Sequence, residues 1–143
     1  TPAAAAMTTI AESTEPGRHS REPRTMSARL HRWDEIALAK VTEMLSQKII
    51  TGEREMIAQT YLKRGALVPI HSHDSEQMTY VLQGALRFLV GGEEVIVREG
   101  EVLHVPADTP HQAEALDDTF ELDVFSPIRQ DWVDIADQPG TEP

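Results

Sequence analysis

The stretch HSHDSEQMTYVLQG, residues 71–84, places two histidines two positions apart and then continues into an apolar segment. In an extended chain the side chains of residues i and i+2 point to the same side, so His71 and His73 face the same way. Two neutral imidazoles side by side are typical of a metal site. The stretch therefore predicts a candidate metal site next to the start of a strand.

The composition narrows the possible partners and ligands. The 143 residues include 13 Lys and Arg against 24 Asp and Glu, which gives a formal charge of -11. A nucleic-acid partner requires a basic face, so we expect none. The chain has no cysteine, so a transition metal must be held by nitrogen and oxygen ligands. No window approaches the ~18 apolar residues of a membrane span, and we expect no membrane partner.

The length and local composition predict one domain between two tails. Residues 1–29 are rich in Thr, Ser, Glu, Pro and Arg and are expected to form a flexible N-terminal arm. Residues 30–133 are the expected domain, and residues 134–143 the C-terminal tail. The arm lacks the long apolar segment of a secretory signal, so we expect a cytoplasmic protein.

Between the tails, short apolar runs alternate with glycine, proline and acidic turns, which predicts many short strands. The expected strands are residues 44–51, 56–62, 77–83, 85–90, 95–98, 102–105, 111–115 and 119–125. Residues 33–45 are equally compatible with a helix capped by Asp34. This even spacing, without crossover helices, favours an all-β antiparallel sandwich or barrel.

Two motifs in this region resemble those of the cupin superfamily. Gly65, five residues, His71-Ser72-His73, Gln77, six residues and Gly84 resemble the first cupin motif, and Gly100, five residues, Pro106 and His111 resemble the second. The resemblance implies a single-domain jelly-roll barrel. It also implies one divalent transition metal, Mn, Fe, Ni or Zn, held by a set of four ligands: His71, His73, Gln77 and His111.

The chain departs from the usual cupin pattern at three positions. Glutamate is usual where Gln77 stands, glycine where Asp108 stands, and asparagine is frequent where Ala115 stands. Glu76 is an alternative ligand, but on a regular strand it faces away from Gln77, which favours Gln77. A neutral amide leaves more of the charge of the metal uncompensated than a carboxylate does, which favours a Lewis acid. His104 is expected to be an ordinary strand histidine.

The strand around residues 119–125 places Glu121, Asp123 and Phe125 on one face and Leu122 and Val124 on the other. In a barrel the inward face lines the pocket, which makes Asp123 a candidate proton carrier and Phe125 a pocket wall. Arg129, just beyond the strand, is a candidate carboxylate binder. The alternative is an exposed aspartate and arginine around a turn.

The run Asp-Val-Phe-Ser-Pro-Ile-Arg, with the first motif, is similar to the KdgF-type cupins of pectin and alginate breakdown. Ile128 stands where that family commonly has a second proline. This similarity implies catalytic roles for Asp123, Phe125 and Arg129, a carboxylated sugar as substrate, and a homodimer. The expected reaction is conversion of ring-closed 4,5-unsaturated uronates to the linear 4-deoxy-5-keto form. The alternatives are a metal-dependent dioxygenase or carbon-carbon lyase, and a non-catalytic binding domain.

Overall fold

The structure of the protein, a computed structural model, describes residues 27–136. Residues 27–31, which contain no helix or strand, belong to one unit of the chain, and residues 32–136 belong to a second. Most of the predicted arm (1–29) and of the predicted tail (134–143) lies outside the described residues. Within residues 27–136, no helix is long and apolar enough to cross a membrane, and the cytoplasmic location stays a prediction.

The second unit consists mostly of strands, with one short 3-10 helix and one α-helix among its described residues. In chain order the elements are η1 (Trp33–Glu35), β1 (Ala39–Thr42), β2 (Leu45–Thr51), β3 (Met56–Leu62), β4 (Leu67–His71), β5 (Glu76–Gln83), β6 (Ala85–Val90), β7 (Glu93–Arg98), β8 (Val102–Val105), β9 (His111–Ala115), β10 (Thr119–Ser126) and α3 (Gln130–Ala136).

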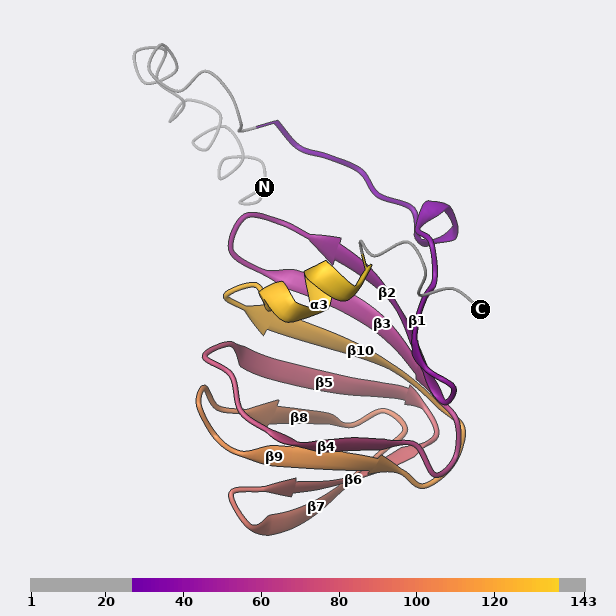
Figure 1. Cartoon of the computed structure of the whole chain (residues 1–143), viewed down its shortest axis with the longest axis vertical. Coiled ribbons are helices and arrows are strands. Elements are labelled where there is room, and N and C mark those ends of the chain that lie inside the picture. Colours follow the sequence, from indigo (N-terminus) through magenta and orange to yellow (C-terminus); the bar gives the residue numbers. More distant parts are fainter. Residues whose placement is uncertain (1–26, 137–143) are drawn as a thin grey trace, which may run out of the picture. The chain divides into compact units, whose positions relative to one another are not determined.

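The strands form two antiparallel sheets (Figure 1). One sheet has the order β1-β2-β3-β10-β5-β8, and the other has the order β4-β9-β6-β7. The late strand β10 lies between β3 and β5, so strands distant in sequence are neighbours. This arrangement confirms the predicted all-β jelly roll.

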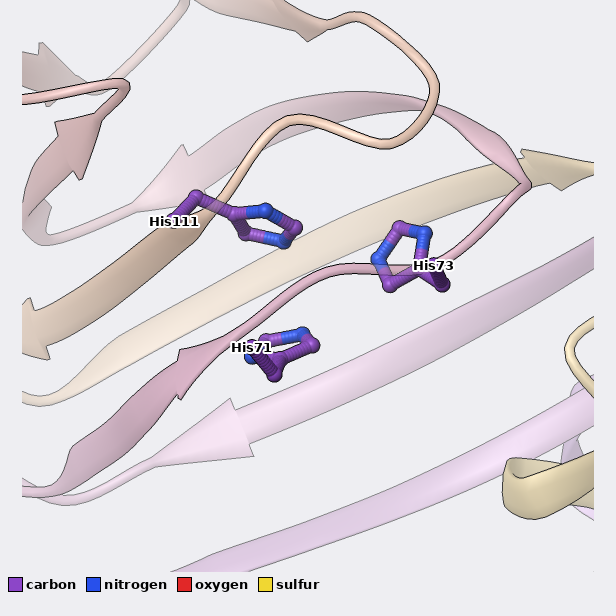
Figure 2. Close-up of side chains that lie close together, drawn as sticks. All are labelled: His71, His73 and His111. Atoms are coloured by element: carbon purple, nitrogen blue, oxygen red, sulfur yellow. The ribbon is translucent and has the colours of Figure 1, made fainter.

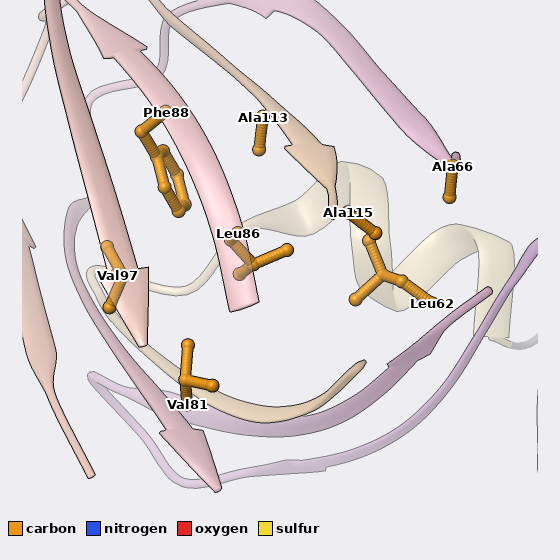
Figure 3. Packing of buried hydrophobic residues seen from close by; sticks show 8 residues of the cluster. All are labelled: Leu62, Ala66, Val81, Leu86, Phe88, Val97, Ala113 and Ala115. Atoms are coloured by element: carbon orange, nitrogen blue, oxygen red, sulfur yellow. The ribbon is translucent and has the colours of Figure 1, made fainter. Parts of the chain in front are cut away.

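The alternation along β10 shows how the sequence builds the interior. Residues 119, 121, 123 and 125 are buried, whereas 120, 122 and 124 are partly exposed. Strands β3 and β5 show the same period of two in their buried side chains. An apolar cluster packs between the sheets (Figure 3), and its members are Leu62, Ala66, Val81, Leu86, Phe88, Val97, Ala113 and Ala115.

A motif glycine forms the tight link between β5 and β6. Gly84 has φ +97°, and a Cβ built there would lie 2.5 Å from the carbonyl oxygen of Asp118 and from Oγ1 of Thr119. Only glycine combines this left-handed backbone with so close an approach of a neighbouring chain. The last glycine of the first motif is therefore explained by packing against the turn that precedes β10.

The structure differs from the sequence-based expectations in three elements. The possible helix over 33–45 is wrong, because only Trp33–Glu35 is helical and β1 and the start of β2 occupy the rest. Strand β4 was not predicted, since Pro69 interrupts its apolar run; proline is tolerated there because β4 is a sheet edge. The C-terminal helix α3 was also not predicted, and it carries Trp132.

Candidate metal centre

Three histidines meet at one end of the space between the sheets. His71 ends β4, His73 follows it in the loop, and His111 begins β9, where it pairs with His71 in the sheet register. One ring nitrogen from each of the three lies within 4.8 Å of the others. Figure 2 shows the rings converging from β9 and from the β4 end. Residues 40 positions apart are thus brought together by one pairing between strands.

Each of these imidazoles is oriented by a backbone carbonyl. Nδ1 of His71, His73 and His111 lies 2.9, 2.9 and 2.8 Å from the carbonyl oxygens of residues 69, 75 and 109. A carbonyl oxygen only accepts, so Nδ1 carries the proton and donates it. The lone pair is then on Nε2 in all three rings. This tautomer, held by a backbone acceptor, is the usual arrangement of metal-binding histidines.

The surroundings also keep two of the rings neutral. Burial lowers the pKa of His111 to about 4, against a weaker opposing effect of its backbone hydrogen bond. Burial lowers the pKa of His73 as well, assisted by the positive charge of Arg129. A neutral imidazole is the form that binds a metal. His73 and His111 are therefore held in the form that binds a metal.

The neighbouring positions 76 and 77 on β5 point to opposite sides. Gln77 is 6% exposed and lines the same cavity as His71 and His111. Glu76 lies on the outer face, where its carboxylate is 2.7 Å from Nε2 of His104. Nε2 of Gln77 donates to Oγ1 of Thr79 at 2.8 Å, which leaves its Oε1 directed elsewhere. The geometry agrees with Gln77, rather than Glu76, as the fourth candidate ligand.

Three buried atoms of this centre lack a protein partner. Nε2 of His73, Nε2 of His111 and Oε1 of Gln77 have no hydrogen-bond partner within residues 27–136. Buried polar atoms are rarely left unpaired. Two imidazole nitrogens and an amide oxygen suit a divalent transition metal, which takes nitrogen and oxygen donors. The residues present therefore fit a bound metal, with His71 as a further nitrogen donor.

A cavity of about 160 Å³ extends from the histidines into the space between the sheets. Beyond the histidines, the polar side chains that border it come mainly from β2, β3, β5 and β10, whereas β4, β9 and β6 contribute mainly apolar ones. The polar side chains include Gln47, Thr60, Gln77, Glu121 and Asp123. Residues expected to be catalytic and residues expected to be ligands thus border one space.

Asp123 is a buried carboxylate held in place by hydroxyl groups. Oγ1 of Thr79 donates to its Oδ1 at 2.6 Å, and Oγ1 of Thr60 donates to its Oδ2 at 3.3 Å. Burial raises the pKa of Asp123, whereas hydrogen bonds from Thr79, Glu121 and Thr60 oppose the rise. A buried carboxyl group whose pKa is raised is a candidate for releasing and accepting a proton during a reaction.

Arg129 packs against the aromatic side chains of Phe125 and Trp132, whose rings also contact each other. Its guanidinium carbon is 5.2 Å from the centre of the Phe125 ring and 4.5 Å from that of Trp132. Nε and Nη2 donate to the carboxylate of Asp131 at 3.3 and 2.7 Å. The residue is only 8% exposed, so the alternative of an exposed arginine at a turn is wrong. Arg129 and Trp132 border both the cavity and an open surface hollow beside His73.

Comparison with known proteins identifies the fold family. Residues 59–126 match the family described as a cupin domain. The chain contains a cupin domain. It is 27% identical over 103 residues to the pectin degradation protein KdgF of Dickeya dadantii, which covers 70% of this chain and 94% of the relative. An uncharacterized protein of Methanocaldococcus jannaschii, MJ1618, is 28% identical over 75 residues, which is 52% of this chain and 60% of that protein.

A solved structure supports the same likeness. The structure of KdgF from Halomonas sp. matches with a TM-score of 0.69 and 29% identity, and the match covers 74% of this chain and 99% of that one. Oxalate decarboxylase OxdC of Bacillus subtilis, at 22% identity and a TM-score of 0.63, shares the fold. The similarity of this cupin to KdgF, expected from the sequence, is confirmed.

The unusual Asp108 of the second cupin motif keeps the backbone shape that glycine normally provides. Its φ is +59°, in the left-handed region that favours glycine but that aspartate tolerates. Its N–H donates to the carbonyl oxygen of His73 at 2.7 Å. The substitution therefore preserves a turn that ties the loop before β9 to the histidine loop.

Sequence reasoning assigned no role to several residues of this cupin site. They are Gln47, Thr60, Thr79, Glu121, Asp131 and Trp132. For Thr60, Thr79 and Glu121 a signal existed, because each is a polar residue at an inward position of a strand whose neighbours at i±2 are buried. Trp132 had no such signal, since its position depends on α3.

Proposed function

We propose that this cupin is a metal-dependent enzyme that opens the ring of 4,5-unsaturated uronates from pectin or alginate. The product is the linear 4-deoxy-5-keto form. The observation that carries the proposal is the shared cavity of Asp123 and the histidine cluster. The named relatives, a pectin degradation protein and a second KdgF, support the class of substrate.

The reaction is an isomerisation, so atoms balance within the substrate. The bond between the anomeric carbon and the ring oxygen breaks, the anomeric hydroxyl gives up its proton, and an aldehyde forms. The enolate that is released accepts one proton on carbon at the former double bond and becomes a ketone. The chemistry therefore needs a group that takes a proton from one place and returns one to another.

In our proposal Asp123 is that group. Thr79 and Thr60 fix the orientation of its carboxyl, so the proton moves at a defined position in the cavity. His71, His73, Gln77 and His111 would hold the metal, which supplies Lewis-acid polarisation of a substrate oxygen when bound. Phe125, fully buried beneath Arg129, excludes water from one side of the cavity.

Arg129 is proposed to bind the substrate carboxylate. Asp131 occupies its Nε and one Nη2 donor, which leaves Nη1 and the second Nη2 proton for a ligand. Packing against Phe125 and Trp132 holds the guanidinium group in place before substrate arrives. The carboxylate would therefore bind near the open hollow, and the rest of the sugar would extend into the cavity.

The homodimer belongs to this proposal as well. Met78, Tyr80 and Val102 expose 45%, 39% and 56% of their surface on the outer face of β5 and β8. An exposed apolar patch on a sheet that ends in an edge strand, β8, favours contact with a second copy. Size-exclusion chromatography with light scattering tests it, and a monomer at micromolar concentration would contradict it.

The test of the function compares the wild type with Asp123→Asn. The wild type should accelerate the loss of ultraviolet absorbance of freshly prepared 4,5-unsaturated galacturonate over the uncatalysed rate. The Asn variant should lose at least 100-fold in kcat, the scale of a missing proton carrier, and should keep its metal content. If the uronate decays no faster with the wild type than without protein, and the wild type takes up oxygen with another substrate, the proposal is contradicted and a dioxygenase is favoured.

A further inference from the structure

The inner part of the cavity contains buried polar atoms that the proposed reaction does not use. Gln47 on β2 is 1% exposed, and neither Nε2 nor Oε1 of its amide has a hydrogen-bond partner in the described part of the chain. Oε1 of Glu121 on β10, which is 6% exposed, is unpartnered in the same way. Both side chains line the cavity that begins at the histidines.

The strand register gives the depth of these groups. Gln77 pairs with Phe125 at the level of the metal ligands, and Thr79 pairs with Asp123 one level further in. Thr60 pairs with both Glu121 and Gln47, which defines a third level. Two residues of a strand span roughly 7 Å, so the Gln47–Glu121 level lies about that far beyond Asp123.

The opposite wall offers these groups no partner. There the cavity is lined by apolar side chains, namely Leu86, Phe88 and Ala113. Leaving a buried amide unpaired is costly, so such groups are retained where something else pairs with them. The unpaired amide of Gln47 and the unpaired Oε1 of Glu121 therefore indicate a polar ligand group at the inner end.

The chemistry of the pair defines that group. The amide of Gln47 offers two N–H donors and one acceptor, and burial raises the pKa of Glu121 well above its ordinary value, with the negative charge of Asp123 adding to the effect. A Glu121 that keeps its proton is neutral, as the amide is, and its unpaired Oε1 accepts, whereas the amide both donates and accepts. A neutral hydroxyl group, which also donates and accepts, satisfies such a pair, whereas a second carboxylate would meet the negative charge of Asp123.

We propose that Gln47 and Glu121 form an inner subsite that binds the neutral, hydroxyl-bearing end of a sugar acid whose carboxylate lies at Arg129. This orientation rests on the proposed function, because it takes Arg129 as the carboxylate binder. Asp123 then lies between the two ends of the ligand. The subsite selects for ligands with hydroxyl groups remote from the carboxylate.

The experiment compares Gln47→Leu with Gln59→Leu. Gln59 is the matched control, since it lies on β3 one residue from Thr60 and faces the outer side of the sheet. Turnover of 4,5-unsaturated galacturonate, metal content and thermal unfolding are measured for both variants and the wild type. Gln47→Leu should raise KM 10- to 100-fold, the loss of one or two hydrogen bonds to the ligand, with metal content unchanged.

Thermal unfolding separates this role from a structural one. Because Gln47→Leu removes an unpaired buried amide, it should raise Tm while it weakens the ligand. Gln59→Leu should leave KM unchanged. A Gln47→Leu variant with the KM of the wild type would overturn the subsite and would leave the proposed function intact.

A binding measurement keeps the subsite testable if the wild type fails to convert the uronate. Calorimetry with D-galacturonate, which has the hydroxyl groups but no double bond, reports binding without turnover. The wild type and Glu121→Gln, which keeps a neutral donor and acceptor, should bind it, and Gln47→Leu and Glu121→Leu should bind at least 10-fold more weakly. Equal binding in all four proteins, or no binding to the wild type, would overturn the subsite.

Discussion

The carboxyl groups of Glu121 and Asp123 project from the same face of β10, two positions apart, and both are buried. Burial raises the pKa of each. A hydrogen bond between the two carboxyl groups raises the pKa of Glu121 further and lowers that of Asp123. Hydrogen bonds from the hydroxyl groups of Thr79 and Thr60 also lower the pKa of Asp123. The two carboxyl groups of one strand therefore differ: Glu121 keeps its proton more strongly, and Asp123 ionises more readily.

This division predicts a pH dependence of folding stability. Glu121 keeps its proton to a higher pH in the folded state than in the unfolded chain, so the folded state binds more protons above the ordinary glutamate pKa. Stability should therefore fall as the pH rises from about 4.5 through the raised pKa of Glu121, by at most about 1.4 kcal/mol per pH unit for one proton.

Glu121→Gln removes this linkage. Urea unfolding should show that the variant gains stability relative to the wild type as the pH increases from about 5 to about 8, with metal present throughout. A difference that stays constant over this range would contradict the assignment of the proton to Glu121.

The hydroxyl group of Thr79 should tune the reaction through Asp123. Thr79→Val keeps the shape of the side chain but removes the donor at 2.6 Å from Oδ1. Because that hydrogen bond lowers the pKa of Asp123, its loss should move the acid limb of the kcat/KM profile to higher pH and reduce kcat about tenfold. An unshifted profile would separate Thr79 from the proton carrier.

Metal binding should stabilise the fold. A ligand that binds only the folded state at 100 times its Kd adds about 2.7 kcal/mol. Tm should therefore rise with added Mn²⁺, Ni²⁺ or Zn²⁺ in the wild type and should not rise in His111→Ala. His104→Ala serves as the control, since His104 pairs with Glu76 on the outer face. An equal rise in Tm for His111→Ala would place the ion elsewhere.

Among the glycines of the first motif, Gly84 should be the one whose substitution reduces stability most. Gly84→Ala combines a left-handed backbone with a Cβ at 2.5 Å from a neighbouring carbonyl oxygen. We expect a loss of about 2–4 kcal/mol in unfolding free energy. Gly92→Ala is the control, because φ is also positive but nothing lies within 4 Å of the added Cβ, and it should cost about 1 kcal/mol. Similar losses in the two variants would contradict the packing explanation.

Much of this structure was predictable because side chains along a strand with one buried face alternate between buried and exposed every two residues. β3, β6, β8 and β9 have the bounds that alternation and turn residues predicted. The inward face of β10 followed from the same rule. β4 did not, because an edge strand with Pro69 and exposed Leu67 and Ile70 has no buried alternation to detect.

Part of the candidate site was predictable from the sequence and part was not. The spacing of His71, His73 and His111 matches known motifs, and the structure brings the three residues together. Gln47 carries no such spacing, since its importance depends on pairing through Thr60 with Glu121, 74 positions later in the chain. Side-chain relationships across non-adjacent strands are set by topology, which local pattern alone does not provide.

The central claim is that the histidine cluster and Asp123 together perform uronate ring opening. The most direct measurement follows the ultraviolet absorbance of 4,5-unsaturated galacturonate with metal-loaded wild type, the same protein with chelator, and His73→Ala. The account predicts decay well above the uncatalysed rate in the first sample and the uncatalysed rate in the other two. Decay at the uncatalysed rate in the first sample, with bound metal confirmed, would contradict it.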